Sequence, residues 1–215
     1  MKHKILLIGA GGHCRVVLDL LRHIKGYEVA GIIDLKENLG AKAFGVSVIG
    51  TDMDLPHFFK SGINYCFISI GSVGNPHVRI KIFNLAKKIG FVFPNLISSN
   101  AKVSSDVILG QGNYVAPGVI INAGASIGNN CIINTGAIAE HDCTLGDFVH
   151  LSPGVILSGG VTIGDCAHVG TGSVVIQNLK IGANAMVGAG SVVTKNVRKN
   201  MIVYGNPCKG RKKNA

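Results

Sequence analysis

The sequence predicts a parallel β-helix preceded by a small α/β domain, and three observations lead to this fold class. A large aliphatic residue returns at every sixth position from Val103 to Val193, with Ala139 as the one exception. The fifth place of each hexad holds mostly Val, Ala, Cys or Ser, and the second place is often Gly. Before these repeats, residues 4–24 read as an apolar strand, a tight glycine loop and a helix.

One large inward residue, one small inward residue and a glycine beside a turn, repeated every six residues, are the signature of a parallel β-helix. Three hexads make one triangular coil, so residues about eighteen apart should stack at a strand spacing of roughly 4.8 Å. The run from Ile97 to Arg198 then gives about five coils. A β-sandwich or an open α/β sheet is the alternative, but neither requires sixteen hexads without a slipped residue. The flat outer faces of such coils favour a homo-oligomer.

The first domain reads as βαβ units. Strands are expected at 4–8, 28–33 and 65–70, with helices at 15–24 and 76–89. Parallel sheets of this kind bind ligands at the carboxyl ends of their strands, where a helix N-terminus can face an anion. Asp34 follows the second strand, at the place of an acidic residue that faces a ribose or a base. The expected site consists of Gly11, Gly12, His13, Asp34 and the loop around 69–75.

The 215 residues have room for two modest domains, and the boundary is expected near Phe93, giving domains 1–93 and 94–215. No apolar run approaches the roughly 18 residues that a membrane span needs, so no span is expected. The six cysteines show no paired spacing and read as reduced thiols, which favours a cytoplasmic location.

The net charge of +10 is carried in part by the C-terminal residues Lys209, Arg211, Lys212 and Lys213. Nucleic acid is disfavoured as a partner, because the chain lacks the interleaved aromatic residues of a single-strand binder and a recognisable reading helix. An anionic small ligand, such as a nucleotide or coenzyme A, and a merely solvated tail are both compatible with this charge.

The one hexad without a large inward aliphatic starts at Ala139 and continues Glu140-His141-Asp142. Histidine titrates close enough to neutral pH to accept a proton, and a neighbouring carboxylate can orient its ring. Adjacent side chains of a strand point to opposite sides, so only one of Glu140 and Asp142 is expected to reach the ring. A solvated surface histidine is the simpler alternative.

Three histidines raise the question of a metal site. His150 and His168 are eighteen residues apart and should stack on successive coils, whereas His141 is expected on a neighbouring face. Because this geometry gives only one stacked pair and no Cys accompanies it, no metal is expected.

Four features together resemble a known family: the loop Gly9–His13, the unbroken hexads, the segment Asn134–Asp142 and the ending Tyr204–Lys209. The family is that of the bacterial hexapeptide-repeat sugar acetyltransferases of the bacillosamine and sialic-acid O-acetyltransferase type. The resemblance implies a left-handed parallel β-helix, a homotrimer with active sites between subunits, and acetyl-CoA as donor. One departure is Asp34-Leu35, where relatives often carry two acids, and it leaves the nucleotide base open.

The resemblance also implies roles for single residues. His141 matches the general base, Asp142 the acid that raises its basicity, and Asn134 a position near the acceptor. The positions that match acetyl-CoA contacts are His150, Thr171 and Ala189, and those that match the nucleotide-sugar site are Gly11, Gly12, His13 and Asp34.

These features favour an N-acetyltransferase acting on the 4-amino group of a UDP- or GDP-linked 4-amino-4,6-dideoxy sugar. Direct transfer from acetyl-CoA with His141 as general base is expected, and backbone amides of the coils would stabilise the oxyanion. The alternative is O-acetylation of a sialic acid or a related sugar. A non-catalytic scaffold or nucleotide sensor and a nicotinamide-dependent oxidoreductase are hypotheses from other classes; the incomplete GxGxxG loop supports the latter only weakly.

Overall fold

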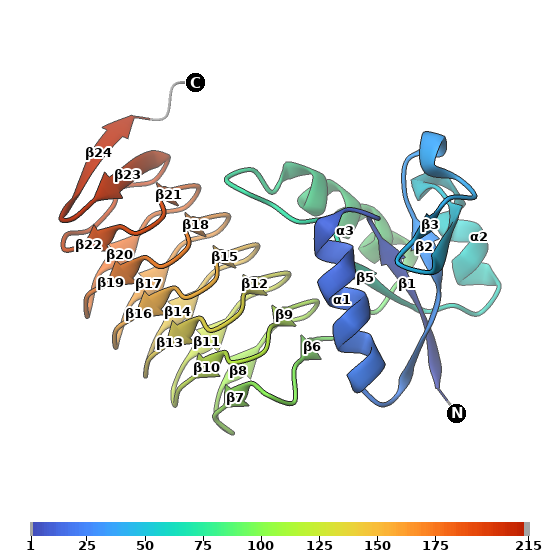
Figure 1. Cartoon of the computed structure of the whole chain (residues 1–215), viewed down its shortest axis with the longest axis horizontal. Coiled ribbons are helices and arrows are strands. Elements are labelled where there is room, and N and C mark those ends of the chain that lie inside the picture. The colour runs from blue at the N-terminus through green and yellow to red at the C-terminus, as the bar shows by residue number, and fades with distance from the viewer. Residues whose placement is uncertain (1, 213–215) are drawn as a thin grey trace. The chain divides into compact units, whose positions relative to one another are not determined.

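The computed structural model describes residues 2–212 and contains two compact units (Figure 1). The first unit extends to Ser72 and continues over residues 76–96; the second comprises residues 73–75 and those from Ile97 on. Phe93, the expected boundary, lies inside the first unit. The elements of the first unit are β1 (His3–Ile8), α1 (Gly12–His23), β2 (Tyr27–Ile33), the 3₁₀-helix η1 (Lys36–Asn38), β3 (Lys42–Ala43), β4 (Val46–Gly50), the 3₁₀-helix η2 (Asp52–Asp54), α2 (Leu55–Lys60), β5 (Tyr65–Ile68) and α3 (His77–Ile89).

The sheet of the first unit has the strand order β3-β4-β2-β1-β5. β1 pairs in parallel with β2 and β5, β2 pairs in parallel with β4, and β3 is antiparallel to β4. The expected strands β1, β2 and β5 and helices α1 and α3 are present. The sequence reading missed β3, β4 and α2, which are two, five and six residues long. Elements this short contain too few residues for their hydrophobic periodicity to be recognised in the sequence.

The centre of this sheet is fully apolar. In β1, Ile5, Leu6, Leu7 and Ile8 are at most 1% exposed, as expected for a strand with neighbours on both sides and both faces covered. Helix α1 buries Val17 and Leu21 and begins at Gly12, directly after the glycine loop. The helix N-terminus therefore lies just beyond the carboxyl end of β1.

The second unit is built around a parallel β-helix of two-residue strands that recur every six residues and whose first strand starts at the last residue of the first unit. These strands are β6 (Leu96–Ile97), β7 (Lys102–Val103), β8 (Ile108–Leu109), β9 (Tyr114–Val115), β10 (Ile120–Ile121), β11 (Ser126–Ile127), β12 (Ile132–Ile133), β13 (Ile138–Ala139), β14 (Thr144–Leu145), β15 (His150–Leu151), β16 (Ile156–Leu157), β17 (Thr162–Ile163), β18 (His168–Val169), β19 (Val174–Val175), β20 (Lys180–Ile181), β21 (Met186–Val187) and β22 (Val192–Val193).

The coils stack with the expected register of eighteen residues. Ile120 pairs with Ile138, which pairs with Ile156, and His150 pairs with His168. The strands form three sheets: β7-β10-β13-β16-β19-β22 (face one), β8-β11-β14-β17-β20 (face two) and β6-β9-β12-β15-β18-β21, which β23 and β24 extend (face three). The inward residues from Val115 to Val193 are buried, so the repeat forms one continuous core.

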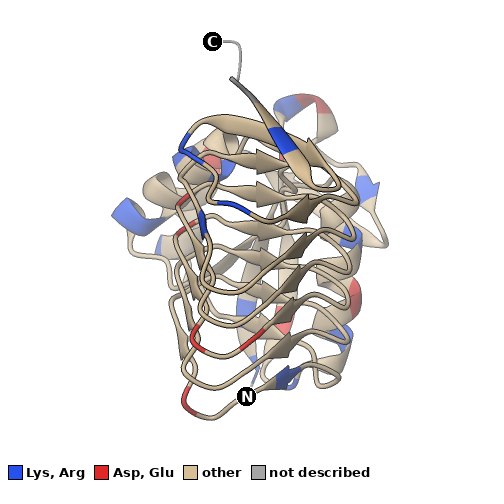
Figure 2. Cartoon of the chain, turned by 90° about the vertical axis from the view of Figure 1, so that its left-hand side faces the viewer, with Lys and Arg blue, Asp and Glu red and all other residues tan. Residues whose placement is uncertain are grey.

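The turns between faces follow two backbone rules. At the second place, a Cβ on Gly164 would lie 2.6 Å from the amide nitrogen of Ala183 on the next coil, so glycine lets the coils approach closely. Each residue that takes the fourth place of a hexad, from Gly112 to Gly190 in steps of six, has a positive φ. Glycine and asparagine adopt that conformation most easily. Figure 2 shows the coils stacked and mostly free of charged residues.

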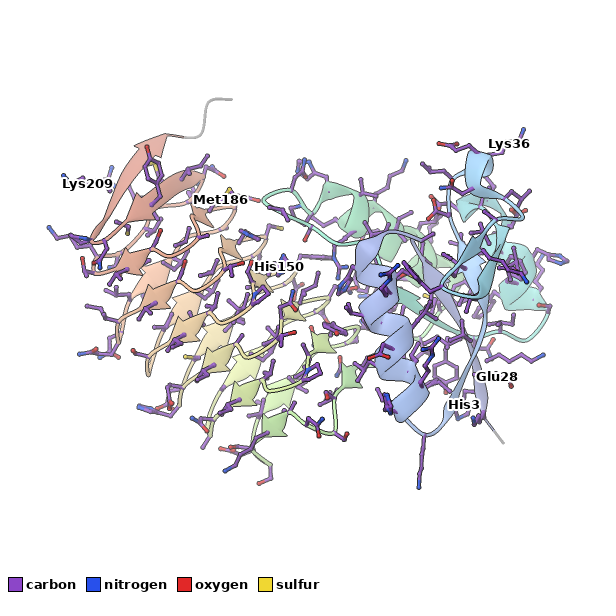
Figure 3. All side chains as sticks on the ribbon, in the orientation of Figure 1. His3, Glu28, Lys36, His150, Met186 and Lys209 are labelled. Carbon is purple, nitrogen blue, oxygen red and sulfur yellow. The ribbon has the colours of Figure 1, made fainter. Side chains whose placement is uncertain are left out.

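The chain continues with β23 (Met201–Gly205) and β24 (Cys208–Lys212), an antiparallel hairpin. Lys209 of the basic tail is exposed in β24 (Figure 3), and Lys213 lies outside the described residues. The six cysteines are free thiols, four of them buried. Within residues 2–212, no helix has the length and apolar character to cross a membrane.

Candidate active site

His141 and Asp142 lie in the turn between β13 and β14, at the corner that joins face one to face two. The expectation that this segment is a strand with alternating side chains was wrong, because the strand ends at Ala139. The turn allows a closer arrangement. Asp142 takes the fourth place of its hexad with φ 60°, and its carboxylate contacts the ring of the preceding residue.

The two side chains form a hydrogen-bonded pair. Nδ1 of His141 is 2.8 Å from Oδ2 of Asp142, and the side chains are 66% and 71% exposed. The hydrogen bond to Asp142 raises the pKa of His141 above its ordinary value, and the negative charges of Asp142 and Glu140 add to the effect. With Nδ1 held by the carboxylate, the other ring nitrogen, Nε2, is available to accept a proton.

Glu140 has a different partner. Its Oε2 accepts a hydrogen bond of 2.8 Å from Nδ2 of Asn122, the residue at the same place on the preceding coil. Of the two carboxylates that sequence reasoning left open, Asp142 therefore holds the ring. Asn122 was missed, although its distance of eighteen residues from Glu140 would have revealed it.

The residues expected at acetyl-CoA gather on another part of the β-helix. His150 lies in β15, Thr171 in the turn after β18 and Ala189 in the turn after β21, and these three strands are neighbours on face three. Figure 3 labels His150 and Met186 on this face. Thr171 and Ala189 occupy the same place on successive coils, where the amide of Gly190 donates to the carbonyl of Thr171 at 2.8 Å. Both are exposed.

Asn134 shares that corner. It follows β12, where face three turns into face one, and its Oδ1 accepts a hydrogen bond of 2.8 Å from the amide of Thr135. His141 lies at the next corner, after face one. One chain thus presents His141 and the Thr171–Ala189 column at different corners of the triangular coil and does not bring them together.

The glycine loop of the first unit has the geometry of an anion site. Gly11 precedes α1, and a Cβ on Gly11 or Gly12 would meet nothing within 4 Å. Packing within the chain therefore does not require glycine at these two positions, and the space leaves room for a ligand at the helix N-terminus. His13 lies in the first turn of α1.

Asp34 ties the glycine loop to the end of β2. Its carboxylate accepts hydrogen bonds from the amide of Leu35 at 2.7 Å, from Nδ2 of Asn38 at 3.0 Å and from the amide of Ala10. Partial burial alone would raise the pKa of Asp34, but these donors outweigh it and lower the pKa. Asp34 is therefore ionised at neutral pH and retains lone pairs for a further donor.

The expected loop around 69–75 is divided. Ser69 is buried, and its hydroxyl donates to the carbonyl of Gly9 at 2.6 Å, which supports the glycine loop from below. Residues 73–75 belong to the second unit. In the part of the chain that the structure describes, no group of three or more His, Cys, Asp or Glu residues is arranged to hold a metal ion.

Comparison with known proteins identifies the family. Residues 4–86 match the model described as PglD N-terminal domain, and residues 160–195 that described as bacterial transferase hexapeptide (six repeats). A histidine-to-asparagine variant of perosamine N-acetyltransferase from Caulobacter crescentus, solved with CoA and GDP-perosamine, is 38% identical with a TM-score of 0.92, covering 98% of this chain and 97% of that one. This chain belongs to the hexapeptide-repeat sugar acetyltransferases.

A second relative of this acetyltransferase is the acetyltransferase domain of PglB from Neisseria gonorrhoeae, solved with acetyl coenzyme A. It is 35% identical with a TM-score of 0.88, and the match covers 97% of this chain and 99% of that one. An uncharacterised protein of Acanthamoeba polyphaga mimivirus is 34% identical over 111 residues, which are 52% of this chain and only 21% of that protein's length.

Family membership confirms several expectations. The acetyltransferase is an enzyme of the acyltransferase class, and its fold is a Rossmann-like parallel-sheet unit followed by a left-handed parallel β-helix of hexapeptide repeats. The period of six predicted the coil, but the left-handed sense came from the family, because ordinary parallel crossovers are right-handed.

Proposed function

We propose that this protein transfers an acetyl group from acetyl-CoA to the amino group of a nucleotide-linked amino sugar. The observation that carries the proposal is the exposed His141–Asp142 pair, which fills the one hexad that departs from the repeat. Its support from relatives is that a 38% identical enzyme was solved with CoA and GDP-perosamine. Bound acetyl-CoA supplies the acyl group as an activated thioester.

In the proposed reaction His141 is the general base. As the sugar nitrogen bonds to the acyl carbon and the carbon–sulfur bond breaks, Nε2 of His141 takes the amine proton and then returns it to the leaving thiolate. Asp142 holds the tautomer that carries the lone pair on Nε2, and its charge stabilises the imidazolium that forms. No covalent enzyme intermediate is needed.

The corner with Thr171 and Ala189 fits an elongated ligand such as acetyl-CoA. Added Cβ atoms on Gly172 and Gly190 would meet nothing within 4 Å, so the turns leave open space along successive coils. Because His141 lies at a different corner of the same chain, we propose that the active site forms between His141 of one subunit and this corner of a neighbour. A homotrimer would close three such sites.

For the first unit we propose the nucleotide end of the acceptor. The amides at the start of α1, at Gly12 and His13, would face the diphosphate, and Asp34 would accept a hydroxyl or base N–H with its remaining lone pairs. Asn134 would lie near the acceptor sugar. We place the reaction in the cytoplasm, because the six cysteines are free thiols, as is usual in a reducing compartment.

The test is thiol release from acetyl-CoA against GDP-perosamine, UDP-linked and other GDP-linked 4-amino sugars, and a sialic acid. Turnover with one amino sugar supports the proposal and identifies the base. Turnover with sialic acid alone moves the activity to O-acetylation, and a folded protein that is silent toward the whole panel contradicts the enzyme function.

A mixing experiment tests the shared site. His141→Ala removes the base and Thr171→Trp blocks the other corner, so each homo-oligomer should be inactive. In oligomers assembled at random from equal amounts of both chains, roughly a quarter of the sites combine two intact halves. Activity near a quarter of wild type supports a site between subunits, whereas no recovery places both halves in one chain.

A further inference from the structure

The ring of His141 lies directly against Gly159, the residue at the same place on the next coil. A Cβ on Gly159 would lie 2.5 Å from Cε1 and 3.0 Å from Cδ2 of His141, and it would also overlap Nε2. Real Cβ atoms essentially never lie as close to a neighbour as this one would to Cε1 and Nε2, so the ring would have to move. The Nε2 edge of the imidazole therefore occupies the space that any side chain at 159 would need.

Glycine at 159 is not required by the backbone. Among the sixteen hexads from Val103, the third place holds Ser, Gln, Pro, Ala, Asn, Thr, His, Asp or Lys in every repeat except this one, where it is Gly. Gly159 is also absent from the residues with positive φ, in contrast to its neighbour Gly160 at 67°. The third place accepts a Cβ in each of the other hexads, so we attribute the glycine at this position to the neighbouring ring of His141.

Glycines at the second place provide the contrast. A Cβ on Gly128 would meet the backbone carbonyl of Gly146, and one on Gly164 the backbone of Ala183, so those glycines serve the close approach of the coils. At Gly159 the three nearest atoms all belong to the imidazole of His141. The requirement is set by one side chain and not by the coil.

We propose that Gly159 is a positioning residue for His141, whose missing side chain leaves the seat on which the Nε2 edge of the imidazole lies. Asp142 holds the other ring nitrogen, Nδ1, at 2.8 Å, and the amide of Gly160 donates to the carbonyl of His141 at 2.9 Å. The hydrogen bond to Asp142 thus holds the ring at Nδ1, and the contact with Gly159 sets the position of Nε2.

A methyl group at 159 has a defined consequence. The imidazole must rotate away, which breaks the hydrogen bond to Asp142 or moves Nε2 off its line to the substrate. Displacing a catalytic atom by about 1 Å can cost on the order of a hundredfold in rate. Gly159→Ala should therefore lower kcat by about tenfold to a hundredfold while KM for both substrates changes little, an expectation that rests on the proposed function.

The decisive experiment compares Gly159→Ala, His141→Ala and the double variant by thermal unfolding, by turnover and by NMR titration of the His141 ring. Gly159→Ala should lower the unfolding temperature or shift the ring titration toward that of a free histidine, because contact with Asp142 is lost. In the His141→Ala background the same alanine should change neither stability nor residual turnover, since no ring remains to collide with it.

Each outcome decides the question. If the double variant unfolds at a lower temperature than His141→Ala, the backbone itself rejects a Cβ and the proposal is wrong. It is equally wrong if Gly159→Ala keeps wild-type turnover, stability and ring titration. If His141→Ala retains full activity, the proposed base fails, yet the unfolding cycle and the titration still report on the contact between residues 141 and 159.

Discussion

The two units support their candidate sites in opposite ways. In the first unit, the residues that shape the glycine loop also hold the fold: Asp34 binds the amide of Ala10, and Ser69 binds the carbonyl of Gly9. In the β-helix, the His141–Asp142 pair occupies one exposed turn of a scaffold that repeats without it. Substitutions at the first site should affect stability together with binding, whereas replacing the exposed side chains of His141 or Asp142 should affect chemistry alone.

The largest expected effect is that of His141→Ala. Loss of a general base typically costs about 10²–10⁴-fold in rate, and the residue is exposed, so kcat should fall by that amount with no change in unfolding temperature. Steady-state turnover and a thermal melt on the same preparation test this. A drop in stability that parallels the drop in rate would contradict the separation of site from scaffold.

Leu151→Ala tests the scaffold itself. Leu151 is 0% exposed at a regular inward place, so its truncation should lower the free energy of unfolding by about 2–5 kcal/mol through lost burial and a cavity. Denaturant unfolding measures this loss. At temperatures where the variant stays folded, kcat should remain near wild type; a large loss of kcat there would show that coil packing and chemistry are not independent.

Asp34→Ala should combine both effects. Removing the carboxylate removes its part-buried hydrogen bond to the amide of Ala10, and a hydrogen bond to a charged group contributes about 1.5–3 kcal/mol of stability. KM for the nucleotide sugar should rise with kcat little changed, because the loop loses its fixed position. Unfolding and saturation curves measure the two effects. Unchanged stability would show that Asp34 does not contribute to the stability of the fold.

Asp142→Asn should lower kcat by about tenfold, a smaller loss than that of His141→Ala, since an exposed hydrogen bond contributes modestly. The pH profile should shift in a defined direction. His141 works as a base only when neutral, so activity falls as pH drops through its pKa, which Asp142 raises. In the variant that pKa falls, and the acidic limb of log kcat against pH should move to lower pH.

Glu140→Gln is the matched control for Asp142→Asn. It removes a neighbouring charge, but Glu140 is hydrogen-bonded to Asn122 and not to the ring. The variant should stay within about threefold of wild type in kcat, because interactions between charges near the surface contribute little free energy. If the acidic limb of the pH profile moves in Glu140→Gln and not in Asp142→Asn, then Glu140 and not Asp142 pairs with the ring of His141.

The sequence by itself determined the repeat and the position of its exception. A period of six with alternating large and small inward residues is best buried by stacked coils, and Ala139 to Asp142 stands out against that rule. It also gave β1, β2, β5 and the glycine loop, because those strands are apolar and bounded by turn residues. The short elements between Asp34 and Ser61 have no such signal.

Only the tertiary structure decided the arrangement around the histidine. That Asp142 and not Glu140 holds the ring follows from a turn with positive φ, which strand alternation could not reveal. The contact of the imidazole with Gly159 links residues that lie eighteen apart in the sequence and stack on successive coils. This contact exists only because the ring of His141 points toward the next coil. Periodicity fixes which residues stack, whereas the direction of each side chain depends on local backbone angles that the period does not contain.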